Sequence, residues 1–136
     1  MQLKKKGFAG ACRNAGIDYP IESEYTWFID SDDWIYDNNV LSKMHDAIVK
    51  YDFPKILRCP LYQFFGNKSK KNYTDKIQLN KNDLLQSGAG PARNCIKTKL
   101  MQRFIENRAK SNDVIWFMRT IDKIAISDIA KVEFPC

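Results

Sequence analysis

The sequence has no long apolar run. Its longest uninterrupted apolar stretch, residues 114–118, has five members, far short of the roughly 20 residues that a membrane-spanning helix needs. The basic start, MQLKKKGFAGA, is not followed by the apolar segment of a secretory signal. We therefore expect a cytoplasmic protein that works in solution or at the surface of a membrane.

Closely spaced cysteines are also lacking. The four cysteines (Cys12, Cys59, Cys95 and Cys136) lie far apart in the chain, which excludes a Cys-x-x-Cys motif for metal binding or redox chemistry. We expect free, mostly buried thiols in a reducing compartment. The sequence also contains no internal repeat and no low-complexity segment.

The composition is that of one soluble globular domain, which we expect to span residues 1–136. Apolar residues make up 44% and charged residues 28% of the chain, as in ordinary folded proteins. The net charge of +6, from 22 Lys and Arg against 16 Asp and Glu, favours polyanions or phosphorylated small molecules as partners without choosing between them. The lysine clusters at 4–6 and 68–71 are typical of solvated loops, so nucleic acid ranks last among these partners.

Local patterns predict alternating helices and strands, and hence an α/β fold. Asp37 or Asn38 is expected to cap a helix that Pro54 ends. Its apolar stripe consists of Val40, Leu41, Met44, Ala47, Ile48 and Tyr51. Ser111 is expected to cap a second amphipathic helix. The other expected elements are helical turns at 11–16 and helices at 82–86 and 98–107; strands at 25–30, 55–65 with a break at Pro60, 94–97 and 125–134; and loops at 66–76 and 87–91.

The second expected helix would bury one apolar face. Its members recur at helical spacing: Val114, Ile115, Met118, Ile121 and Ile124. By contrast, residues 25–30 are apolar on both faces, which is typical of a strand inside a covered sheet.

Residues 25–36, YTWFIDSDDWIY, run from this strand into a group of carboxylates. Residues i and i+2 of a strand point to the same side, so Asp30 and Asp32 could converge just past its end, where ligands bind in open α/β sheets. Two carboxylates with open coordination positions suit Mg²⁺ or Mn²⁺. The alternative is that residues 30–33 only cap a turn and the helix that follows.

The segment FAGACRNAGIDYPIESEYTWFIDSDDWI, residues 8–35, closely resembles the central part of family 2 glycosyltransferases of the GT-A fold. The family's Gly-rich loop and Ala-Arg-Asn-x-Gly helix start are followed by an apolar strand and Asp-x-Asp. Cys12 stands where the family has Ala. The resemblance implies a Rossmann-like mixed sheet flanked by helices, and transfer of a single sugar from a nucleotide donor to an acceptor hydroxyl.

The resemblance also implies roles for individual residues. Asp30 would lie near the ribose or donor sugar, and Asp32 would ligate Mg²⁺ or Mn²⁺ bridging the diphosphate of a UDP- or GDP-linked sugar. Arg13 would bind phosphate or base edges, and Asn14 would hold the local loop together. Asp113, within SNDVIWF, would be the base for a saccharide or lipid-linked acceptor, although helix capping explains its position equally well. For Arg13 the alternative is a surface salt bridge.

The family's first strands and most of its nucleotide pocket have no counterpart here, so we expect an N-terminally truncated, partial domain. Its sheet edges would be exposed and could pair in a homodimer. Two further functions stay open, a non-catalytic remnant that acts in assembly and a basic nucleic-acid-binding module. Trp34, Tyr36 and Trp116 could stack on a sugar ring, although core packing is the expected use.

Overall fold

A computed structural model provides the structure of the chain. It describes residues 9–19, 22–65, 69–73, 80–86, 90–106 and 112–135.

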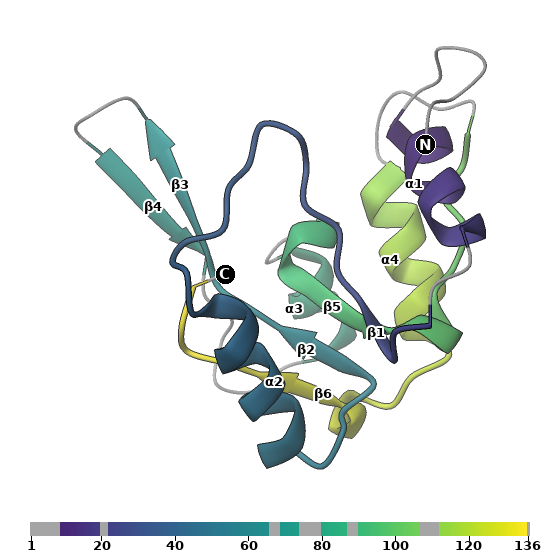
Figure 1. Ribbon diagram of the computed structural model, residues 1–136. Coiled ribbons are helices and arrows are strands. Elements are labelled where there is room, and N and C mark those ends of the chain that lie inside the picture. Colours follow the sequence, from purple (N-terminus) through teal and green to yellow (C-terminus); the bar gives the residue numbers. More distant parts are fainter. Residues whose placement is uncertain are drawn as a thin grey trace.

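A four-stranded mixed sheet forms the centre of the molecule (Figure 1), in the order β1 (Tyr25–Thr26), β5 (Asn94–Lys97), β2 (Ile56–Arg58) and β6 (Ile129–Lys131). Strand β5 pairs antiparallel with both β1 and β2, whereas β2 and β6 are parallel. With its helices this sheet confirms the predicted α/β class. The pairing of a second copy at a sheet edge stays a prediction.

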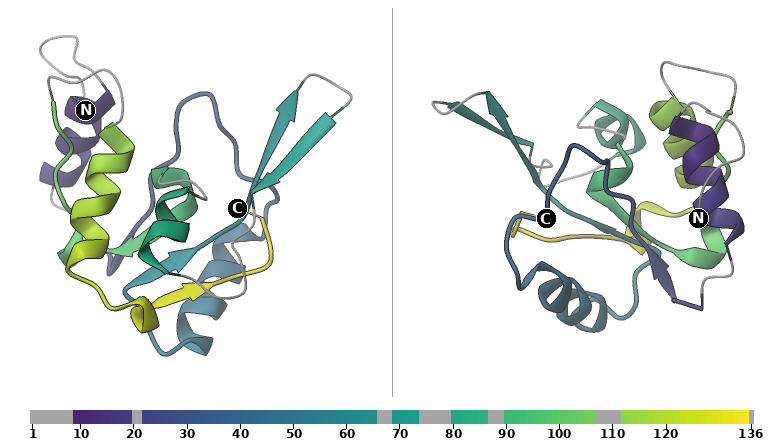
Figure 2. Two further views of the ribbon diagram at one scale, coloured as in Figure 1. Left: turned by 180° about the vertical axis from the view of Figure 1, so that it is seen from behind. Right: turned by 45° about the horizontal axis from the view of Figure 1, so that its top comes forward.

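Helices cover both faces of the sheet (Figure 2, right). One face packs against α2 (Val40–Lys50), and the other lies towards α3 (Lys81–Gln86) and α4 (Asn112–Asp122). Successive strand residues point to opposite faces: Leu57 belongs to the cluster beneath α2, and its neighbour Ile56 to the cluster beneath α3 and α4. The sheet therefore separates two hydrophobic cores, one on each of its faces.

The region that follows β2 forms a separate hairpin. Strands β3 (Leu61–Phe65) and β4 (Ser69–Tyr73) pair antiparallel in a second sheet, which projects from the body in Figure 1. The predicted break at Pro60 is confirmed, since it separates β2 from β3. The predicted loop over residues 66–76 is wrong at Ser69–Tyr73, where cross-strand backbone pairing forms a strand from a polar sequence.

The apolar segment before the acidic residues is not the covered strand that its composition predicted. Only Tyr25–Thr26 pairs, at the edge of the described sheet. Beyond it, the indole Nε1 of Trp27 donates to the carbonyl of Ala92 at 2.7 Å, and Phe28 packs edge-on against Phe104. After Thr26 the chain therefore makes tertiary contacts through its aromatic side chains and does not continue the strand pairing with β5.

The helix predicted over residues 98–107 is also wrong. The chain forms only a 3₁₀ turn, η2 (Thr98–Leu100), and is irregular from 101 to 106. The backbone N–H of Phe104 donates to the side chain of Asn14 at 2.8 Å, a bond that an α-helix would make within itself. A tertiary contact thus replaces the helical one.

The predicted apolar face of α4 is confirmed in part: Ile121 and, just past the helix, Ile124 are buried. Its buried residues are Asn112, Trp116, Phe117, Thr120 and Ile121. Val114 and Met118 are 42% and 49% exposed, because the large rings that pack against the sheet lie on the opposite side of the helix.

The ends of several elements differ from the predictions. Helix α1 (Ala9–Asp18) continues past Gly16, where an end was expected. The final strand is confined to β6, which directly follows a 3₁₀ turn, η3 (Ile126–Asp128). Another 3₁₀ turn, η1 (Pro91–Arg93), directly precedes β5. The extended segment at 94–97 and the short helix near 82–86 are confirmed as β5 and α3.

The predicted cap of α2, Asp37 or Asn38, is wrong by one or two positions. The N-cap is Asn39, without a side-chain cap bond. Asp37 lies two residues before the N-cap, where its carboxylate accepts a 2.7 Å hydrogen bond from the backbone N–H of Asn39 and pairs with Lys43. Val40, Met44 and Ala47 are buried as the stripe predicted, but the stripe is wrong at Leu41 and Tyr51, which are 62% and 42% exposed.

The cysteines differ from the expectation of free thiols. Cys59 is disulfide-bonded, whereas Cys12 is free and exposed and Cys95 is free and buried. Burial raises the pKa of the Cys95 thiol to about 12. Cys136 lies outside the described residues. Within the described ranges no helix is both long and apolar enough to cross a bilayer.

Candidate functional site

Arg13 joins two acidic residues that lie far apart in the sequence. Its Nη1 donates to Asp113 and its Nη2 to Asp30, each at 2.5 Å. Arg13 lies on α1, Asp113 in the first turn of α4, and Asp30 beyond β1. Figures 1 and 2 show α1 beside α4. Three of the four predicted site residues are therefore in direct contact.

The face of α1 that carries Arg13 is fixed against the segment before α4. A Cβ on Gly10 would lie 2.5 Å from the carbonyl oxygen of Ile105, so only glycine fits this approach. Asn14 accepts from the N–H of Phe104 and donates to its carbonyl, at 2.8 and 2.9 Å. Asn14 therefore anchors α1 to a segment 90 positions further along the chain, instead of holding its local loop together as expected. Because Gly10, Arg13 and Asn14 are spaced i, i+3 and i+4, they share one helix face.

The Arg13 guanidinium is nearly buried, whereas the carboxylates that it binds reach solvent. The exposed fractions of the side chains are 11% for Arg13, 45% for Asp30 and 39% for Asp113. The guanidinium carbon also lies 5.1 Å from the centroid of the Phe104 ring. Burial opposes the charge of Arg13, but the hydrogen bond to Asp30 and the charges of both carboxylates outweigh it and raise the pKa of Arg13 above its usual range.

The acidic residues form a turn. The N–H of Asp33 donates to the carbonyl of Asp30 at 3.0 Å, so the strand alternation that predicted convergence of Asp30 and Asp32 does not apply. Asp32 is exposed and forms no ion pair within the described part of the chain. Burial, and then the charges of Asp30 and Asp32, raise the pKa of Asp33 above its usual range. Negative charge is therefore concentrated at this turn.

The turn fits a divalent cation in its donor chemistry but supplies only part of a coordination shell. Carboxylate oxygens are the ligands that Mg²⁺ and Mn²⁺ prefer. The described residues contain no group of three or more His, Cys, Asp or Glu side chains able to hold a metal ion, and Asp30 is already bound to Arg13. A cation held by Asp32 would need further ligands from substrate oxygens and water.

The aromatic residues that could stack on a sugar differ in burial. Trp116 is 1% exposed and stacks on Phe104 at 4.8 Å, so core packing is confirmed there. Trp34 is 70% exposed and Tyr36 46% exposed, so core packing is wrong for these two. Tyr36 makes a tilted contact with Tyr62, their ring centroids 5.2 Å apart. The sequence reveals neither this pair nor the position of Phe104 beneath Arg13, because both depend on contacts between distant segments.

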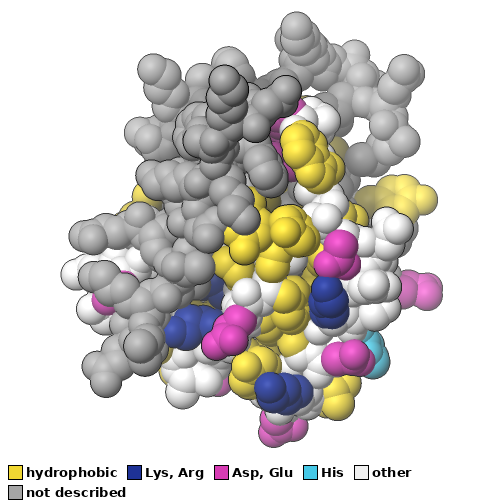
Figure 3. All heavy atoms as spheres, turned by 90° about the vertical axis from the view of Figure 1, so that its left-hand side faces the viewer, with side chains coloured by type: hydrophobic (Ala, Val, Ile, Leu, Met, Phe, Trp, Pro, Cys, Tyr) yellow, Lys and Arg dark blue, Asp and Glu magenta, His cyan; other side chains and the backbone are white. Residues whose placement is uncertain are grey.

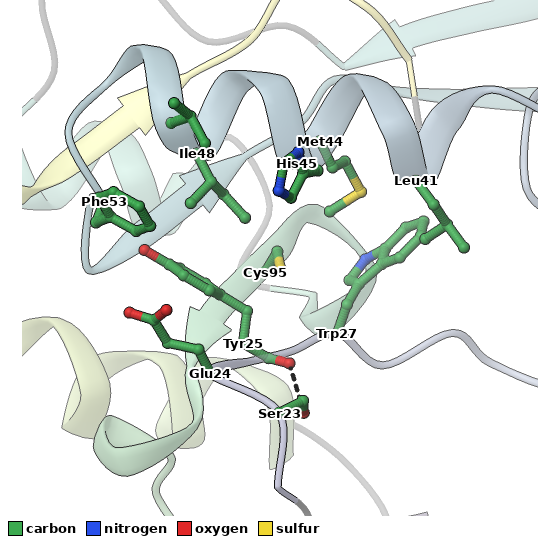
Figure 4. A pocket seen from close by; sticks show the side chains of 11 residues that line it. Ser23, Glu24, Tyr25, Trp27, Leu41, Met44, His45, Ile48, Phe53 and Cys95 are labelled. Carbon is green, nitrogen blue, oxygen red and sulfur yellow. Dashed lines mark hydrogen bonds between the residues drawn. The ribbon is translucent and has the colours of Figure 1, made fainter.

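A hollow of about 410 Å³ lies between α2 and the β1 segment (Figure 4). Its lining is largely apolar and includes Tyr25, Trp27, Met44, Ile48 and Phe53. None of the four candidate site residues lines it. Figure 3 shows another view of the surface, in which hydrophobic side chains lie together between charged ones.

Comparison with known proteins gives no relative: no protein-family model, no curated protein and no solved structure matches the chain.

Proposed function

We propose that the chain is a family 2-like glycosyltransferase domain of the GT-A type, or part of one, that transfers a single sugar from a nucleotide donor. One observation carries this proposal. Arg13 of the ACRNAG motif contacts Asp30 of the Asp-x-Asp motif and Asp113 of SNDVIWF. The resemblance gave each a role at one reaction centre, and a shared centre requires such residues to be neighbours.

The proposed chemistry divides the carboxylates by position. Asp30 contacts the donor sugar or ribose, and Asp32, exposed at the turn, is the cation ligand. A bound Mg²⁺ or Mn²⁺ would supply positive charge for the departing nucleoside diphosphate. Asp113 accepts the proton of the acceptor hydroxyl while the oxygen bonds to the anomeric carbon and the bond to the diphosphate breaks. A saccharide or lipid-linked acceptor would approach the exposed side of Asp113.

A non-catalytic remnant is the second candidate, and the same ion pairs favour it. Arg13, Asp30 and Asp113 satisfy one another and tie α1 to α4 without any ligand. A triad that is only structural would look the same in the nucleotide-free chain. Ligand binding separates the two functions.

The deciding measurement is thermal unfolding with UDP or GDP, each with and without Mn²⁺. A ligand present at a hundred times its dissociation constant stabilises the fold by about 2.7 kcal/mol. For a chain of this size each kcal/mol corresponds to roughly 3–5 °C, so we expect a rise of about 10 °C with nucleotide and Mn²⁺ together. The Asp32→Ala variant should lose this rise.

The matched control is Asp46→Ala, which removes a carboxylate whose side chain is 83% exposed on α2. It should keep the full rise. If no nucleotide shifts the midpoint, or if Asp32→Ala shifts as much as the unmodified chain, the catalytic proposal is wrong and the remnant is favoured. Steeply salt-dependent binding of DNA or RNA would instead favour a nucleic-acid module.

A further inference from the structure

The ion pairs of Arg13 place it in competition with any cation at the acidic turn. One guanidinium faces the carboxylates of Asp30 and Asp113, while Asp32 and Asp33 add negative charge beside Asp30. Within the described residues, no other Lys, Arg or His side chain pairs with Asp30. A divalent cation held by Asp32 therefore has a neighbouring carboxylate, that of Asp30, which is already bound to a positively charged side chain.

The geometry allows one of the two pairs to open without unfolding. The backbone at Arg13 is held by its helix neighbours Gly10 and Asn14, and the guanidinium rests on the Phe104 ring. Nη1 and Nη2 bind different carboxylates, so the pair with Asp30 can separate while the pair with Asp113 persists. Both carboxylates reach solvent, and water can therefore replace the lost partner at modest cost.

We propose that Arg13 is a positioning residue that exchanges partners when the donor site fills. In the nucleotide-free chain it binds Asp30 and Asp113. When a divalent cation and a nucleoside diphosphate bind, Nη2 passes from Asp30 to an oxygen of the diphosphate, while Nη1 keeps Asp113 in place.

This inference rests on the proposed function. An arginine is suited to the exchange because its donors are spread over a planar fork and can bind two anions at once. The consequence is that donor binding and the position of the base Asp113 are connected through one side chain. Arg13 thus weakens binding of the bare cation but strengthens binding of the cation with its diphosphate.

The opposite signs of these two effects supply the test. Free Mn²⁺ is followed by electron paramagnetic resonance during titration of the chain, first alone and then with UDP. We expect Arg13→Met to bind Mn²⁺ alone about tenfold more tightly, because a positive charge beside the acidic turn is lost. With UDP present it should bind Mn²⁺ about tenfold more weakly, because the diphosphate loses a charged donor. A charge-assisted hydrogen bond has about this worth.

Two further variants guard against misfolding and against a general charge effect. Arg13→Lys keeps the charge but has no planar fork, and we expect a smaller gain with Mn²⁺ alone and a partial loss with UDP. Lys43→Met removes a positive charge that pairs with Asp37 and should change neither affinity more than twofold. Circular dichroism establishes that each variant is folded.

The outcomes distinguish this inference from the function on which it rests. If the unmodified chain binds Mn²⁺ with UDP but Arg13→Met changes both affinities in the same direction, or neither, the partner exchange is wrong and the glycosyltransferase proposal stands. If neither the unmodified chain nor any variant binds Mn²⁺ with UDP, both proposals are wrong. Arg13→Met supports the exchange if it binds Mn²⁺ alone more tightly and Mn²⁺ with UDP more weakly, while Lys43→Met shows neither change.

Discussion

Replacing Asn14 by Ala should destabilise the fold strongly, because its amide satisfies two backbone groups of Phe104. Asn14 is 1% exposed and Phe104 3% exposed, and the amide accepts from the N–H of Phe104 and donates to its carbonyl. A buried polar group left without its partner costs about 1–3 kcal/mol. Two such groups lose their partner, and water that enters from the exposed side of Glu106 hydrates them in part. We therefore expect the free energy of unfolding to fall by about 3 kcal/mol.

Urea unfolding followed by tryptophan fluorescence measures this loss as a lower midpoint at an unchanged slope. The matched control is Asn38→Ala, the same substitution at an exposed position before α2, where the change should stay within about 0.5 kcal/mol. Asn14→Asp places a carboxylate against the carbonyl of Phe104 and near Glu106, and should cost at least as much as Asn14→Ala. A loss for Asn14→Ala no larger than the control would refute the view that this amide anchors α1.

Gly10→Ala should lower the free energy of unfolding in urea by about 1–3 kcal/mol, because the added methyl group overlaps the backbone of Ile105. The control Gly16→Ala, whose Cβ would lie 3.8 Å from its nearest neighbour, should cause no measurable loss. Equal losses for the two variants would contradict the docking of α1. Iodoacetamide at pH 8 should modify Cys12 and leave Cys95 intact in mass spectra of the folded chain, since the thiolate is the reactive form and the pKa of Cys95 is about 12. Rapid modification of Cys95 would show that its surroundings open to solvent.

Some features of the fold follow from local sequence alone. The stripe of α2 predicts the burial of Val40, Met44 and Ala47, because a helix of 3.6 residues per turn presents one face to a sheet. Pro60 predicts the break after β2, since proline has no N–H to donate to a ladder. In these places a residue's own chemistry decides its structure.

Other features could not be predicted because distant residues compete with local ones. The segment after η2 has a helical pattern, but Asn14 binds the N–H of Phe104 that a helix would use. Helix α4 carries apolar residues on more than one side, and only the positions of the sheet and Phe104 make Trp116 and Phe117 the buried ones. Pattern alone does not rank such faces, since each would bury apolar area.

The candidate site divides in the same way. The sequence by itself determined which residues are candidates for the proposed chemistry: the motifs supply Arg13, Asp30, Asp32 and Asp113 and the kinds of ligand that they suit. Only the tertiary structure decided that Arg13 contacts both Asp30 and Asp113 while Asp32 remains exposed at the turn. The reason is physical. A pair separated by 100 positions meets only when α1 docks beside α4, and that docking depends on the space left at Gly10 and on the two hydrogen bonds of Asn14.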